Sequence, residues 1–124
     1  MIAGRSDLRT WLWAACVLSA FVVTHVPPAG RGPRVIPDYI LHFAGFSALG
    51  IVTCWRFAGA NRRLTLKAWW FGVAFLAVYG IVDETTQPIF GRSCELSDYL
   101  ADLCGNFAGM TIGGICVRAS ASRK

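Results

Sequence analysis

Four long apolar stretches, each bounded by polar residues, follow one another along the chain over residues 11–26, 39–57, 64–82 and 100–117. Each has about 16 to 19 residues. At ~1.5 Å per residue, a helix of this length with its polar-ended turns spans a hydrocarbon core of ~30 Å. We therefore predict an all-α fold, an integral membrane four-helix bundle with helices over about residues 10–27, 38–58, 64–87 and 98–117.

Composition supports the membrane setting and argues against a water-soluble globule. Hydrophobic residues make up 55% of the 124 and charged residues 15%, whereas a soluble domain has about 25% charged residues. One membrane domain over residues 1–124 accounts for the chain, which has no internal repeat. An alternative for the first stretch is a cleaved signal peptide, because Arg5 and Arg9 precede it and Pro27 and Pro28 follow it.

The cations are divided unevenly between the two ends of the predicted helices. Nine of the 12 Lys and Arg residues fall on the end that carries both termini: Arg5, Arg9, Arg56, Arg62, Arg63, Lys67, Arg118, Arg123 and Lys124. An excess of cations in short loops marks the cytoplasmic side, so we expect both termini in the cytoplasm and a multi-pass location in the cell (inner) membrane. The basic pI then reflects topology and contact with the lipid bilayer, not a nucleic-acid partner.

Six of the seven acidic residues gather at the opposite, outward-facing end: Asp38, Asp83, Glu84, Glu95, Asp98 and Asp102. A carboxylate near hydrocarbon is costly, about 2.5 to 3.5 kcal/mol at a helix centre, so such groups usually have a partner or a task. Helix capping is the alternative for Asp38 and Asp98, since both lie at predicted helix N-termini, whereas Asp102 lies a turn too deep.

Other polar residues share helix faces with these carboxylates. His42 lies four residues after Asp38 and therefore points the same way. Gln87 lies within a turn of Asp83 and Glu84, immediately before Pro88, which we expect to end that helix.

Arg92 follows in a short hairpin. Its guanidinium group is expected either to bind an anion or to form a structural ion pair with Glu95, Asp98 or Asp83.

The fourth helix carries a stripe of small residues. Gly105, Gly109 and Gly113 recur every four residues on the face that also holds Asp98 and Asp102. Small residues at this spacing let membrane helices approach closely. We therefore expect this face to pack inside the bundle and to turn Asp102 inward.

Four short motifs occur in a fixed order. They are D-x-x-x-H-F (Asp38, His42, Phe43), D-E-x-x-Q (Asp83, Glu84, Gln87), G-R (Gly91, Arg92) and D-x-L-A-[ND]-x-x-G-x-x-x-G (Asp98, Leu100, Ala101, Asp102, Gly105, Gly109). Over about residues 36–114, their order and spacing resemble the VanZ-like family. The resemblance implies a small four-helix bacterial membrane protein. The family is named after a member linked to teicoplanin resistance, and its biochemical activity is unsettled.

The chain departs from that family pattern at one position. The family usually reads D-K at its first motif, and here Tyr39 follows Asp38. If the lysine pairs an outer carboxylate or binds an anion, this protein either lacks the family activity or uses Arg31, Arg34 or Arg92 in its place.

Three classes of function fit these residues. The leading hypothesis is a binding protein whose outward polar pocket engages an envelope component, such as a phosphate-bearing lipid or a cell-wall fragment. The binding residues would be Asp38, His42, Asp83, Glu84, Gln87, Arg92, Asp98 and Asp102. The second is a membrane-embedded hydrolase or transferase in which Glu84, His42 and Asp102 perform acid–base or metal chemistry. The third is a structural or assembly role.

Familiar signatures of enzymes and metal sites are missing from the sequence. There is no H-E-x-x-H, no G-x-S-x-G and no C-x-x-C spacing. We therefore predict no resident metal and no cofactor, and the sequence does not decide whether the protein is an enzyme.

Overall fold

The structure, a computed structural model, describes residues 5–27, 36–58 and 63–122. Within these ranges the elements are α1 (Arg5–His25), α2 (Asp38–Phe57), α3 (Leu66–Thr86), the short 3₁₀ helix η1 (Gln87–Phe90) and α4 (Leu96–Ala121). Each of the four α-helices is long and apolar enough to cross a membrane. The prediction of an all-α fold with four potential membrane-spanning helices is therefore confirmed.

Local sequence explains several of the helix ends. Pro37 precedes α2, and the Thr65 hydroxyl oxygen caps α3 by accepting a hydrogen bond from the backbone N–H of Ala68. Pro88 does not stop helical structure at once. Instead α3 passes into η1, which holds the proline in its first turn, and Gly91 ends η1 with a left-handed φ of 76°.

The last helix is longer than predicted at both ends. It begins at Leu96 and ends at Ala121, whereas the prediction was residues 98–117. The added residues, 96–97 and 118–121, include neither proline nor glycine, so helical hydrogen bonding continues beyond the predicted ends.

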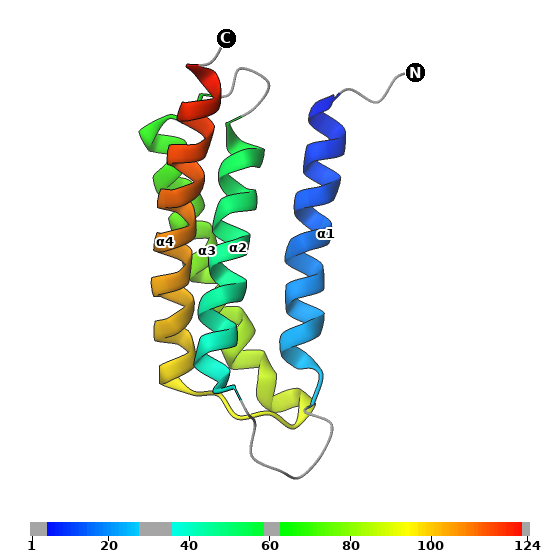
Figure 1. The fold of residues 1–124 in the computed structure, drawn as a ribbon. Helices are drawn as coiled ribbons and strands as arrows, with labels where there is room; N and C mark the ends of the chain where they lie inside the picture. The colour runs from blue at the N-terminus through cyan, green and yellow to red at the C-terminus, as the bar shows by residue number, and fades with distance from the viewer. Residues whose placement is uncertain (1–4, 28–35, 59–62, 123–124) are drawn as a thin grey trace.

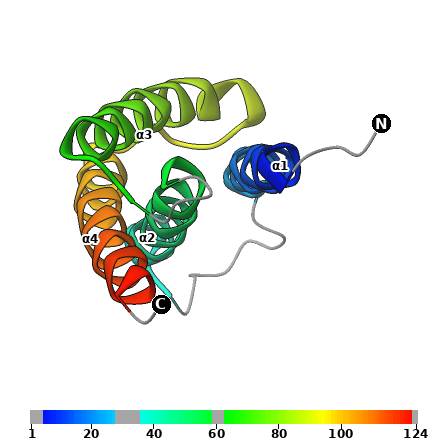
Figure 2. The same cartoon turned by 90° about the horizontal axis from the view of Figure 1, so that it is seen from above.

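The helices run alternately up and down, so that α1 and α3 begin at the end where α2 and α4 finish (Figure 1). Seen along the bundle, α3 and α4 enclose α2 on two sides, while α1 stands apart on its far side (Figure 2). The most extensive helix contact is that between α2 and α4, and α1 packs mainly against α2. Three helices thus form a close-packed unit with α1 alongside.

The predicted glycine stripe lies in the contact between α2 and α4. A Cβ atom at Gly105 would overlap the carbonyl oxygen of Phe43, and one at Gly109 would overlap that of Ser47. At Gly113 it would lie 2.8 Å from the Cβ of Cys54. The backbones of α2 and α4 are therefore in direct contact, which small residues at a membrane helix interface make possible.

Large apolar side chains cover the outside of the bundle. Val23 is 71% exposed, Phe71 64% and Ile115 63%. The interior instead combines a small apolar core around Leu76 and Met110 with many buried polar side chains. An apolar surface of this extent is expected for a protein whose solvent is lipid.

Side-chain hydrogen bonds attach α1 to the rest of the bundle. The indole N–H of Trp13 donates to the hydroxyl oxygen of Thr53 at 3.0 Å, and the Tyr79 hydroxyl group donates to the carbonyl oxygen of Val17 at 3.1 Å. Because α1 packs less closely than the other helices, these bonds fix its register while leaving space beside it.

Candidate functional site

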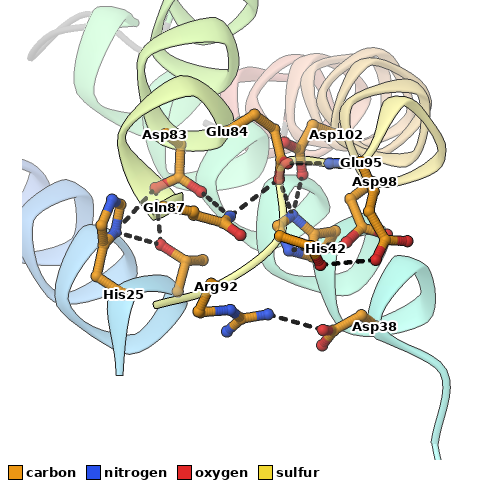
Figure 3. A network of polar contacts seen from close by, with 12 residues as sticks. His25, Asp38, His42, Asp83, Glu84, Gln87, Arg92, Glu95, Asp98 and Asp102 are labelled. Atoms are coloured by element: carbon orange, nitrogen blue, oxygen red, sulfur yellow. Dashed lines mark hydrogen bonds and ion pairs between the residues drawn. The ribbon is translucent and has the colours of Figure 1, made fainter. Parts of the chain in front are cut away.

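The predicted polar residues come together at one end of the bundle, where α1 and α3 finish and α2 and α4 begin (Figures 1 and 3). We call this the polar end. Six of these side chains are at most 4% exposed: His42, Asp83, Glu84, Gln87, Asp98 and Asp102. Asp38 and Arg92 lie at the edge of the group, where the Asp38 side chain is 30% exposed.

His42 lies at the centre of this cluster, on the first turns of α2. Its Nδ1 atom is 2.9 Å from Asp102 Oδ1 and 3.4 Å from Glu84 Oε1, while its Nε2 atom is 3.8 Å from Asp98 Oδ2 (Figure 3). The glycine stripe explains this placement, because close contact of α2 with α4 brings the inward face of α4, with both aspartates, against the imidazole ring. One imidazole therefore faces three carboxylates from two helices.

Residues at the end of α3 contribute a hydrogen-bonded group to the cluster. The side-chain amide of Gln87 donates to Glu84 Oε1 at 3.0 Å and to Asp83 Oδ2 at 3.3 Å. Glu84 Oε2 accepts the backbone N–H of Glu95 at 3.2 Å. These bonds tie α3, η1 and the start of α4 to one another and orient both carboxylates.

Arg92 pairs with a different carboxylate from those expected. Its guanidinium Nη2 atom lies 2.7 Å from Asp38 Oδ2, not against the carboxylates of α3 or α4 that the sequence suggested. Gly91 turns the chain at the end of η1 and directs Arg92 toward the start of α2. The alternative cations Arg31 and Arg34 lie outside the described residues.

Neither Asp38 nor Asp98 is an N-cap. The N-cap positions are Pro37 for α2 and Glu95 for α4, and neither makes a side-chain capping hydrogen bond. Asp98 is buried against His42 instead. Asp98 therefore belongs to the buried cluster.

Two residues of α1 that the sequence analysis did not single out also join the cluster. The Thr24 hydroxyl group donates to Asp83 Oδ1 at 2.7 Å. His25 is 5% exposed, with Nδ1 3.7 Å from Asp83 Oδ1 and Nε2 2.8 Å from the hydroxyl oxygen of Thr86. The predicted topology could have indicated both residues, because α1 must finish at the same end of the bundle at which α2 begins.

A pocket opens between α1 and α2 and reaches the cluster. Its volume is about 530 Å³. The walls are mainly apolar, from Ala20 and Val23 of α1 and from Leu41, Phe46 and Leu49 of α2, and they end on Asp38, His42 and Arg92. Pockets of roughly 300–1,000 Å³ with apolar walls and a few converging polar groups are typical of small-molecule sites.

The charges of the buried cluster do not balance among the side chains that form it. Asp83, Glu84, Asp98 and Asp102 are all nearly fully buried, and the basic groups in contact with them are the imidazole rings of His25 and His42. Burying unpaired carboxylates is costly. The arrangement can therefore take up protons or a cation, and it can use His42 as an acid, a base or a ligand.

The cluster also has the composition of a metal-ligand set. His42, Asp83, Glu84 and Asp102 can each offer one ligand atom such that all four atoms lie within 4.8 Å of one another. Asp83 and Glu84 are adjacent, but the other members of the set lie 18 to 60 positions from one another in the chain. Motif searches based on local spacing could not detect such a set.

The chain matches no protein-family model, no curated protein and no solved structure. The resemblance to the VanZ-like family therefore depends on the four motifs alone.

Proposed function

We propose that this protein binds an amphiphilic component of the cell envelope. The apolar chain of the ligand lies in the pocket between α1 and α2, and its polar head lies at Asp38, His42 and Arg92. One observation carries the proposal: the pocket is apolar along its walls and polar where it meets the cluster. An amphiphile has the same two-part character.

Arg92 and the start of α2 suggest a phosphate-bearing head group. A guanidinium group binds phosphate through two parallel hydrogen bonds. The N-terminus of a helix adds favourable partial charge and free backbone N–H groups. An incoming phosphate would compete with the carboxylate of Asp38 for Arg92. The ligand we favour is thus a phosphate-bearing lipid or a lipid-linked cell-wall fragment.

The distribution of cations supports an outward-facing pocket. Most Lys and Arg residues belong to the end opposite the polar end, which by the positive-inside rule is the cytoplasmic end of a protein of the cell membrane. The four VanZ-like motifs agree with an envelope ligand and extend the proposal to a link with glycopeptide resistance of the teicoplanin type.

A membrane-embedded hydrolase or transferase is the second candidate. The contact between His42 and Asp102 favours it, because a carboxylate can orient an imidazole ring and stabilise its protonated form for general acid–base catalysis. Release of product from the bound lipid would indicate this activity, whereas recovery of the intact lipid after prolonged incubation would indicate binding alone.

Filling the pocket tests the binding proposal. A Cβ atom at Gly45, which lines the pocket, meets no atom within 4 Å. Gly45→Leu therefore fills pocket space without disturbing the backbone. Its matched control is Ala44→Leu, which adds the same side chain to an exposed position outside the pocket lining.

Binding of a fluorescent long-chain lipid phosphate is measured for the detergent-purified protein. The wild type and Ala44→Leu should bind the lipid, and Gly45→Leu should bind it at least several-fold more weakly. Equal binding by the two variants, or no binding by the wild type, would refute the proposal.

A further inference from the structure

We propose that His42, Asp83, Glu84 and Asp102 form a binding site for a divalent transition-metal ion. The four residues come from α2, α3 and α4, all are buried, and their potential ligand atoms lie within 4.8 Å of one another. Of these four residues, His42 alone also lines the apolar pocket. The metal site does not depend on the lipid-binding proposal.

The orientation of His42 suits metal binding through Nδ1. That atom faces Asp102 Oδ1 and Glu84 Oε1, whereas Nε2 faces Asp98 Oδ2 at 3.8 Å. A metal-binding histidine commonly directs its other ring nitrogen at a carboxylate, which fixes the tautomer and raises the basicity of the coordinating nitrogen. Asp98 occupies that supporting position.

The carboxylates are also held from outside the site. Thr24 donates to one oxygen of Asp83, and the amide of Gln87 donates to the other. Glu84 accepts hydrogen bonds at both oxygens, from Gln87 and from the backbone N–H of Glu95. Each oxygen retains a second lone pair, so these bonds orient the ligands without preventing coordination.

An unsatisfied oxygen atom provides independent support. Asp102 is 1% exposed, and its Oδ2 atom has no hydrogen-bond partner among the described residues. The side chain points into the group formed by His42 and Glu84 (Figure 3). An unpaired, buried carboxylate oxygen is strongly destabilising unless a cation or proton satisfies it. A divalent ion would also offset much of the excess negative charge of the cluster.

The ligand types select a class of metal. Imidazole nitrogen suits zinc, iron, copper and nickel, whereas an all-oxygen set suits magnesium and calcium. One imidazole with up to three carboxylates, and no thiolate in the set, fits Zn²⁺ or Mn²⁺ better than Mg²⁺ or Ca²⁺.

The test is a titration of the full-length protein in detergent. The protein is stripped with a chelator and dialysed, then titrated with Zn²⁺ and with Mn²⁺, and bound metal is measured by calorimetry and elemental analysis. We expect one ion per chain for the wild type. Failure of the wild type to bind either ion at micromolar concentration overturns the proposal, whatever the variants do.

Variants locate the ion. His42→Asn and Asp102→Asn should abolish stoichiometric binding, and Asp98→Asn should weaken it by about 10- to 100-fold, as for other residues that support a ligand. Glu95→Gln is the control, because this exposed carboxylate lies at the polar end but outside the ligand set and accepts its hydrogen bond from Ser93. Helical content by circular dichroism confirms folding. Unchanged binding in folded His42→Asn or Asp102→Asn would place the metal elsewhere and overturn the assignment.

Discussion

Replacing Gly109 with alanine tests the contact that brings α4 and its aspartates against His42. The added Cβ would meet the carbonyl oxygen, carbonyl carbon and Cα of Ser47. These are backbone atoms of α2, which no side-chain rotation can move away. Accommodation therefore requires α2 and α4 to separate.

The expected magnitude follows from two opposing effects. Inserting a methyl group into a closely packed interface costs about 1–3 kcal/mol. Alanine is intrinsically better than glycine in a helix by roughly 0.5–1 kcal/mol, which offsets part of that cost. We therefore expect Gly109→Ala to lower the free energy of unfolding by on the order of 1 to 2 kcal/mol.

Gly45→Ala is the matched control on α2. No atom lies within 4 Å of a Cβ atom built at Gly45, so only the helix preference applies. This variant should be as stable as the wild type or more stable by about 0.5–1 kcal/mol. The assay is equilibrium unfolding in mixed detergent with increasing SDS, followed by circular dichroism. If both variants have equal stability, α2 and α4 are not in backbone contact at Ser47, and the inward direction of Asp102 loses its basis.

Three further predictions concern the polar end. Glu84→Gln keeps the shape of the side chain and removes its charge, but its NH2 group can no longer accept one of the two hydrogen bonds from Gln87 and Glu95. A metal site therefore predicts loss of metal binding with a stability loss of only about 1–3 kcal/mol. A purely structural network predicts instead a stability loss of about 3–5 kcal/mol. Arg92→Lys should fold but bind the lipid phosphate more weakly, because an ammonium group lacks the bidentate fork; binding at wild-type strength would exclude Arg92 as the phosphate ligand. Cys94, which is exposed at the polar end, should react with an impermeant thiol reagent added outside intact cells, and labelling only after lysis would reverse the proposed orientation.

Properties that depend on local sequence could be predicted directly. The lengths of the apolar stretches predict four helices, because each is long enough to cross the hydrocarbon core of a bilayer. A segment that crosses this core must satisfy its own backbone hydrogen bonds, as a helix does. Pro37 marks the start of α2 for a similarly local reason. The spacing of Gly105 and Gly109 determines that they share a face of α4, since helical periodicity is a property of the chain alone.

The chemistry of the polar end was decided only by tertiary structure. Helical spacing places Asp38 and His42 on one face of α2. Even so, His42 contacts carboxylates of α3 and α4, whereas Asp38 pairs with Arg92. These partners are 42, 60 and 54 positions apart, and no periodicity along one helix predicts which helices pack or how each is rotated about its axis. The contact of Thr24 with Asp83 and the pocket beside α1 likewise arise from the position of α1. The sequence by itself determined which polar residues reach one end of the bundle, whereas helix packing decided which of their atoms meet.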